Sequence, residues 1–277
     1  MSGFEKMEPE QYRELKQKER EEVYEMLSET TQDLMDRGEM IAYLDLQAKL
    51  FDQTPSNVLL IKKQLPEATW IRSAEEWKSD NIYTIKGKEA IKILSSSSYR
   101  KDDGSLGTSY NVAKVFDISQ TTASNRTIHS KKYRNVHEAI LHRFPCTLEV
   151  TGDVPGGLDA VYDRDQEVIF VREGMDKDKS FLAIARELSC YELMRMDYNK
   201  SRDDVLPYAE CAAYLLAKRY GVDAPEPDVD RLIEGFNGRE KKQVRKDLSD
   251  MKRSASVIDV KIKEFERKAR EDKESER

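Results

Sequence analysis

The chain has 277 residues, which is long for one domain and comfortable for two. Apolar residues make up 38% of it and charged residues 36%, so the chain can bury a core, and the regular apolar spacing argues against general disorder. The formal net charge of −6 excludes a general polyanion binder and leaves room only for a local basic patch.

The N-terminal residues are polar and charged, and no apolar run approaches the roughly 20 residues that span a bilayer. We therefore expect no signal peptide and no membrane partner. The three cysteines, Cys146, Cys190 and Cys211, are odd in number and form no close pair. This pattern indicates a reducing, cytoplasmic location rather than a disulfide framework.

The first expected elements are helices. A charged helix is expected over residues 5–37 and a second over 38–52, where the Asp-Gln-Thr-Pro segment breaks it. Ser56 is then a natural N-cap for a short helix over 57–64, because its hydroxyl can accept a free amide of the first turn.

Two β-prone runs follow, at residues 90–94 and 110–119. The serine-rich segment between them contains Asp103-Gly104, a turn signal. These features predict a hairpin with a long loop.

Residues 126–146 are basic and indicate a linker that runs into a helix. A second hairpin is expected where two short apolar runs, 160–162 and 168–171, flank the turn 163–166. Ser180 can cap a helix over about 181–196. A further helix is expected over about 206–220, ending at Gly221.

The C-terminal tail has the clearest periodicity. Its apolar residues alternate in spacings of four and three, which is a heptad seam: Val244, Leu248, Met251, Ala255, Ile258, Ile262 and Phe265. We expect one helix that buries this stripe against another helix, either in the same chain or in a dimer, and the last dozen residues to fray.

Aromatic side chains lie among lysines and arginines in the region 56–121. Bases stacked on aromatics beside cations that follow phosphates are the usual way to hold a single strand. The candidate nucleic-acid-binding residues are Lys62, Lys63, Trp70, Arg72, Trp77, Lys86, Lys88, Lys92, Tyr110 and Lys114, with Lys131 and Lys132 in the basic stretch. Two alternatives remain open. The tryptophans can instead be core residues, and the basic stretch can instead be a solvated linker.

The order of motifs in this region resembles the N-terminal domain of the ArdC antirestriction family and its LtrC-like relatives on conjugative elements. The resemblance rests on Gln64-Leu-Pro-Glu-Ala-Thr69, Trp77, Lys86-Gly-Lys88 and Val115-Phe-Asp-Ile-Ser-Gln-Thr121. The resemblance covers about residues 40–122 and implies a domain that binds single-stranded DNA.

Residues 157–221 resemble the zincin-like metallopeptidase domain of the same family. There one helix carries H-E-x-x-H and the next supplies a Glu as third zinc ligand. The segment of this chain in the first position is Arg186-Glu-Leu-Ser-Cys190, and Glu210 stands where the resemblance puts the third ligand.

The departure from H-E-x-x-H changes the chemistry. Arg186 cannot donate a lone pair, and it brings a positive charge to the place of the metal. Cys190 and Glu210 could ligate, but two ligands do not make a catalytic three-ligand site. We therefore interpret Arg186, Glu187, Cys190 and Glu210 as vestigial and expect Arg186 to pair with Glu210 or Glu187. The sequence thus indicates no catalytic residues, no metal and no cofactor.

The expected fold class is α+β. Its parts are a mixed α/β single-strand-binding domain at 1–125, a zincin-like α+β domain at 126–235, and a long helical tail at 236–277. The expected function is single-stranded-DNA binding, of antirestriction type, in a mobile or conjugative element, with an inactive peptidase-like domain. The alternatives are an unorthodox zinc peptidase using Glu187, Cys190 and Glu210, or a scaffold that recruits a protein partner or a second copy through the tail.

Overall fold

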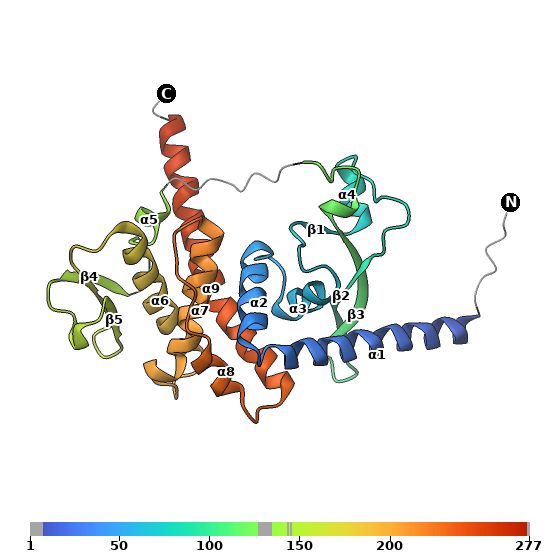
Figure 1. Ribbon diagram of the computed structural model, residues 1–277, viewed down its shortest axis with the longest axis horizontal. Helices are drawn as coiled ribbons and strands as arrows, with labels where there is room; N and C mark the ends of the chain where they lie inside the picture. Colours follow the sequence, from blue (N-terminus) through green and yellow to red (C-terminus); the bar gives the residue numbers. More distant parts are fainter. Residues whose placement is uncertain (1–7, 127–134, 143, 145, 276–277) are drawn as a thin grey trace. The chain divides into compact units, whose positions relative to one another are not determined.

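The computed structural model describes residues 8–126, 135–142, 144 and 146–275. In this part the chain is α+β, with two three-stranded sheets and a long C-terminal helix, which confirms the expected fold class (Figure 1). Contacts divide it into two compact units, Met1–Asp33 with Asp52–Thr127 and Leu34–Phe51 with Ile128–Arg277. The segment 34–51 thus groups with the second unit, whereas the sequence suggested the first.

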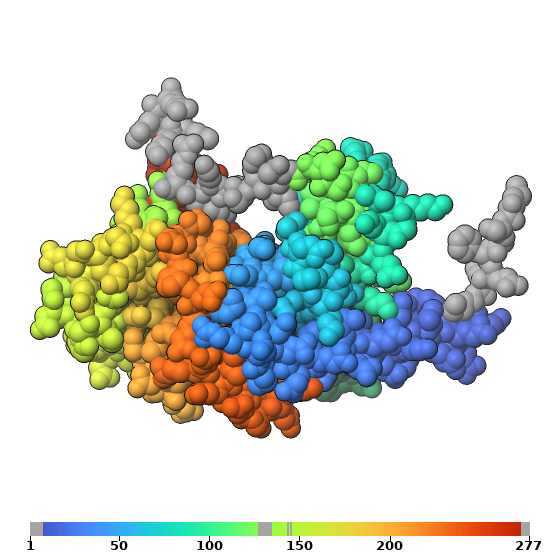
Figure 2. Space-filling view, in the orientation of Figure 1, coloured from blue at the N-terminus to red at the C-terminus, as the bar shows by residue number. Residues whose placement is uncertain are grey.

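The first unit consists of helices that flank an antiparallel sheet of strand order β1-β3-β2. Its elements are α1 (Pro9–Asp33), α3 (Pro55–Gln64), β1 (Ile71–Arg72), α4 (Ala74–Ser79), β2 (Ile91–Arg100), β3 (Leu106–Asp117) and the 3-10 turn η1 (Ile118–Gln120). The N-terminal half of α1 is exposed and projects past the other elements of its unit (Figures 1 and 2).

Helix α3 is capped by Thr54, not by Ser56 as the sequence suggested, because the Thr54 hydroxyl accepts the Asn57 amide. Pro55 then occupies the first helical turn, where its fixed φ suits the helix and its missing N–H is not needed. Side chains of this helix hold β2: Asn57 bonds the backbone of Leu94, and Gln64 bonds that of Lys92.

The expected long loop between the two β-prone runs is wrong, because the strands continue through the serines to a tight turn. The register runs from Ile91 opposite Val115 to Arg100 opposite Leu106. The Ser97 and Ser109 hydroxyls bond across the strands at 2.7 Å. Cross-strand pairs of this kind stabilise a sheet although serine has little strand preference of its own.

The second unit contains α2 and most of the C-terminal elements. They are α2 (Arg37–Lys49), α5 (Val136–Ala139), β4 (Thr147–Thr151), the 3-10 turn η2 (Pro155–Gly157), β5 (Ala160–Asp163), β6 (Val168–Arg172), α6 (Lys177–Met196), α7 (Arg202–Tyr220), α8 (Asp230–Phe236) and α9 (Lys241–Ser275). Its sheet has the order β4-β6-β5, with β4 parallel and β5 antiparallel to β6.

The expected hairpin 160–171 is confirmed as β5 and β6. Helix α6 begins one turn earlier than expected, because Asp176 rather than Ser180 caps it. Helix α7 also begins earlier, behind a capping box of Ser201 and Asp204, and ends as expected at Gly221, whose φ of 69° suits glycine.

The heptad tail forms the single helix α9, as the spacing predicts. It packs against α5, α6 and α7 of the same unit (Figure 1). The seam is fully buried there from Val244 to Ile262, and Phe265 stacks on the His142 ring at 5.3 Å. Of the two arrangements left open, the structure has the packing within the chain. No helix in the described residues is long and apolar enough to cross a membrane.

Candidate functional sites

The four residues that the comparison with H-E-x-x-H singled out meet where α6 packs against α7. Arg186 and Cys190 are one helical turn apart on α6, with Glu187 beside them, and Glu210 lies on α7. Helix α6 also packs on β5 and β6, which brings backbone groups of the sheet to this helix. The arrangement therefore places four side chains at a junction of two helices and a strand.

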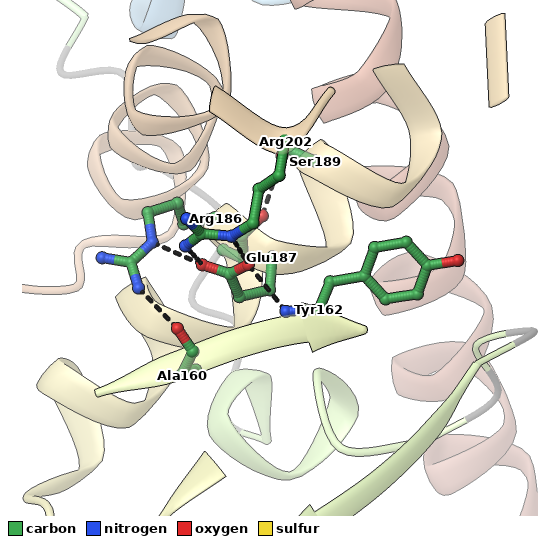
Figure 3. Close-up of polar contacts among 7 residues, drawn as sticks. Ala160, Tyr162, Arg186, Glu187, Ser189 and Arg202 are labelled. Atoms are coloured by element: carbon green, nitrogen blue, oxygen red, sulfur yellow. Dashed lines mark hydrogen bonds and ion pairs between the residues drawn. The ribbon is translucent and has the colours of Figure 1, made fainter. Parts of the chain in front are cut away.

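Glu187 is fully buried and has four hydrogen bonds (Figure 3). One oxygen accepts from Arg186 Nε at 2.8 Å and from Arg202 at 2.7 Å. The other accepts from Arg202 Nε and from the Tyr162 amide, both at 2.9 Å. A carboxylate offers about four lone-pair directions, so this one is saturated.

Arg186 pairs with Glu187, which confirms one of the two expected partners. Its second contact is a bond of 3.0 Å to the Ala160 carbonyl on β5, so the guanidinium joins α6 to the sheet (Figure 3). Within the described part of the chain, it makes no ion pair with Glu210, the other expected partner.

Arg202 is the residue that the sequence analysis missed. It forms a two-point ion pair with Glu187, and this hydrogen bond raises the pKa of Arg202. A signal existed, because Arg202 is the first residue of α7, and a cation is unfavourable near a helix N-terminus unless a partner holds it.

Cys190 is buried, and burial raises the pKa of its thiol well above the usual value, with the nearby Glu187 adding to the shift. The thiol therefore stays protonated at neutral pH. A metal ligand must be a thiolate. Burial and the nearby Glu187 charge therefore disfavour Cys190 as a metal ligand.

A cavity of about 560 Å³ opens beside Arg186 and Glu210. Its walls carry more carboxylates than cations, and they include Asp159, Asp176, Asp178, Asp223, Glu226 and Asp228. Burial raises the pKa of Glu210, and the field of Arg186 opposes that shift. Glu210 is thus the carboxylate of the motif that remains open to a cavity.

The two tryptophans of the first unit have different environments. Trp77 is fully buried, packs with Ile82 and Ile118, and donates its Nε1 hydrogen to the Phe116 carbonyl at 2.9 Å. It cannot stack on a base without opening the core, so its assignment to nucleic-acid binding is corrected to a core role. Trp70 is 37% exposed.

Arg72 lies over the Trp70 ring, with its guanidinium carbon 4.7 Å from the ring centre, and it also pairs with Asp80. Trp70 is positioned through its amide, which donates to the Asp117 carboxylate. Tyr110, Lys86 and Lys88 are exposed. Neither lysine makes an ion pair within the described residues.

The remaining candidate cations differ. Lys62 is half-buried, and Lys63, Lys92 and Lys114 pair with acidic residues of α1. The sequence analysis did not anticipate these pairings. Lys131 and Lys132 lie outside the described residues.

The fold and these sites define a two-unit α+β protein with a partly exposed aromatic-cation stack in one unit and a buried carboxylate between two arginines in the other. Two crystal structures of the antirestriction protein ArdC from plasmid R388 are similar to it. The metal-free structure has a TM-score of 0.55 at 13% identity and the Mn(II)-bound structure 0.57 at 11%. Each match covers 86% of this chain and 98% of the other.

The chain therefore has an ArdC-like fold, as the resemblance implied. At this level of identity the similarity concerns the fold alone. No protein-family pattern matches the sequence, and no curated protein matches it either.

A divalent ion between α6 and α7, which the resemblance would imply, does not fit the residues present. Arg186 offers no lone pair, Cys190 is buried as a thiol, and Glu187 is saturated. Among the residues that the structure describes, no group of three His, Cys, Asp or Glu side chains could hold a metal ion.

Proposed function

We propose that the first unit binds single-stranded nucleic acid and that the chain acts, like the plasmid protein whose fold it shares, in antirestriction for a mobile element. The observation that carries the proposal is the Trp70 indole, partly exposed beneath the Arg72 guanidinium. An aromatic face beside a cation can stack on any base while the cation meets a phosphate.

Two neighbouring features support this position. Lys86 and Lys88 are exposed on the turn that leads to β2, where they can reach phosphates. Tyr83 is 51% exposed, and its amide donates a hydrogen bond to the Thr122 hydroxyl. Thr122 follows the 3-10 turn η1, whose first residue, Ile118, donates its amide hydrogen to the Trp70 carbonyl. Exposed aromatics with unpaired cations suit a flexible single strand better than a rigid duplex.

We further propose that the second unit does not hydrolyse peptides. Zincin chemistry needs a Glu that accepts a proton from metal-bound water. The Glu187 carboxylate has its four acceptor positions filled by Arg186, Arg202 and the Tyr162 amide. Its pairing is better suited to a structural link between α6, α7 and β5 than to catalysis.

Titration of a labelled oligonucleotide at two salt concentrations tests the binding proposal. We expect a preference for the single strand over duplex, with affinity that falls as salt rises, because phosphate neutralisation releases counterions. Equal or tighter binding to duplex at moderate salt, or no binding at micromolar protein, contradicts the proposal.

Elemental analysis and a peptide-cleavage assay test the second proposal. We expect no stoichiometric zinc and no cleavage. One zinc per chain, lost on replacement of Cys190 or Glu210, would revive the peptidase interpretation. The double change Arg186→His with Cys190→His is expected to raise zinc affinity. Adding Arg202→Ala is expected to raise it further, because Arg202 also binds Glu187.

A further inference from the structure

Helix α1 presents a row of carboxylates to the lysines of its own unit. Glu19 lies 3.6 Å from Lys114 Nζ, and Glu22 lies 3.0 Å from Lys92 Nζ. About two helical turns after Glu22, Glu29 lies 3.8 Å from Lys63 Nζ. Spacings of three and seven residues place the three glutamates on one side of the helix.

The lysines themselves form an unfavourable arrangement without these carboxylates. Lys92 and Lys114 are directly opposite each other on β2 and β3. Like charges at facing positions destabilise an antiparallel pair. Anions beside the two lysines relieve this repulsion, and α1 supplies them.

The helix is held by contacts other than the ion pairs. Val23 and Leu27 are buried, and α1 packs against α3 and β3. Arg20 adds a hydrogen bond of 3.1 Å to Asn111 on β3. The side chains of Glu22, Glu29, Lys63 and Lys114 are about half exposed, so these ion pairs can exchange partners while the helix stays in place. Lys92 is less exposed at 30%, and Glu19 is the most covered member of the set at 15%.

We propose that α1 is an acidic clasp whose Glu19, Glu22 and Glu29 carboxylates occupy the positions that nucleic-acid phosphates would take on Lys63, Lys92 and Lys114, so that the chain restrains its own affinity for single strands. This inference rests on the proposed function of the first unit. It adds a second phosphate track, along α3 and the β2–β3 hairpin, that opens when the carboxylates are displaced.

The competition follows from the chemistry of the two anions. Both carboxylate and phosphate oxygens accept charge-assisted hydrogen bonds from an ammonium group. Lys16 also binds Glu19 at 2.8 Å and lowers the pKa of that carboxyl, so Glu19 stays ionised and available to Lys114 at neutral pH. Lys63 Nζ also lies 3.8 Å from the Asp33 carboxylate at the end of α1. A strand must therefore displace these three glutamates and Asp33 before it can use the three lysines.

The test uses the full chain with Glu19→Gln, Glu22→Gln and Glu29→Gln together. The matched control is Glu10→Gln, Glu14→Gln and Glu21→Gln, which removes the same charge from exposed glutamates on another face of the same helix that make no ion pair within the described residues. Glutamine keeps the side-chain shape, and circular dichroism checks that α1 is retained. Binding of a labelled single-stranded oligonucleotide is measured over a salt series.

The clasp variant is expected to bind about eightfold more tightly, because each exposed ion pair accounts for about a factor of two. Its salt dependence should steepen by about 2 in logarithmic slope, since three more phosphates are neutralised. The control should change by less than about twofold, because charges away from the track are screened.

Equal gains in both variants, or wild-type affinity and slope in the clasp variant, overturn the clasp and leave the proposed function standing. Absence of binding by all three proteins overturns the proposed function, and the clasp with it. Loss of α1 helicity with an unchanged slope also overturns the clasp, because it removes the carboxylates without opening a track.

Discussion

The two units contain ion-pair networks of similar composition and opposite accessibility. In the first unit, the lysines of α3 and the sheet meet the glutamates of α1 at the surface, where Lys63 and Glu29 are both largely exposed. In the second unit, Arg186 and Arg202 meet Glu187, which is fully buried. Surface pairs are weak and exchange with solvent ions, whereas a buried charge that loses its partner is strongly destabilising.

The comparison teaches that burial, and not charge, decides what each network can do. The exposed network can release its cations to another anion, so it suits binding. The buried network cannot release Glu187 to a water or a metal, so it suits a structural link.

The largest effect is expected for Arg202→Ala, which removes two of the four hydrogen bonds to Glu187. Breaking a buried pair costs about 3–5 kcal/mol of unfolding free energy. The loss is expected near the lower end of this range, because Arg186 still contacts the buried Glu187 carboxylate. Denaturant unfolding measures it, with Arg267→Ala, which breaks an exposed pair on α9, as the control. A loss below about 1 kcal/mol would show that Arg186 alone suffices.

Trp70→Ala is expected to weaken single-strand binding by about 1–3 kcal/mol, which is about five- to 150-fold in affinity, through loss of a stacking face. The fold should be little affected, because Trp70 is partly exposed. Tyr99→Ala on the β2–β3 hairpin, another half-exposed aromatic, is a matched control. Equal losses of affinity for both changes would show that Trp70 has no specific role in binding the single strand.

Glu210→Gln tests the carboxylate that faces the cavity. Burial raises its pKa above the usual 4.5, so the folded state binds the proton more tightly than the unfolded state. The stability that this proton provides is present below about pH 4.5 and is lost as the pH rises through the raised value. The variant should therefore melt slightly higher than wild type at pH 7, with the difference vanishing near pH 4. A lower melting temperature at pH 7 would show that ionised Glu210 is stabilising.

Lys92→Ala should have the smallest effect on stability, within about 0.5 kcal/mol, because its pair with Glu22 is exposed and removing it also relieves the repulsion from Lys114. Thermal unfolding at low and high salt checks this. A loss comparable to that of Arg202→Ala would break the contrast between the two networks.

Local patterns predicted the long helices and the two hairpins, but not the short elements β1, α4, β4 and α8 or the ends of several helices. The heptad spacing of Val244 to Ile262 defines a helix whatever it packs against. Caps were misassigned at Ser56 and Ser180, because several oxygen-bearing residues stood near each helix start, and backbone geometry selected Thr54 and Asp176. Strand β4 was missed, because a short edge strand with exposed residues has no clear alternation.

The candidate sites were predicted in part. The motif residues Asp117 and Gln120 have a structural role that position alone could not reveal: Asp117 accepts amides of Thr69 and Trp70, and Gln120 donates to the Glu89 carbonyl. Trp70 and Trp77 have the same chemistry in the sequence, and only the packing of α4 against β3 buries one of them.

The sequence by itself determined the helical periods, the helix end at Gly221 and the inability of Arg186 to donate a lone pair to a metal, because these depend on the properties of single residues and their near neighbours. The tertiary structure alone decided that Arg202 joins Arg186 on Glu187, that α9 closes its seam on α5, α6 and α7, and that α1 neutralises the lysines of its unit. Partners far apart in the chain meet only through packing, and burial then sets how strongly each charge is held.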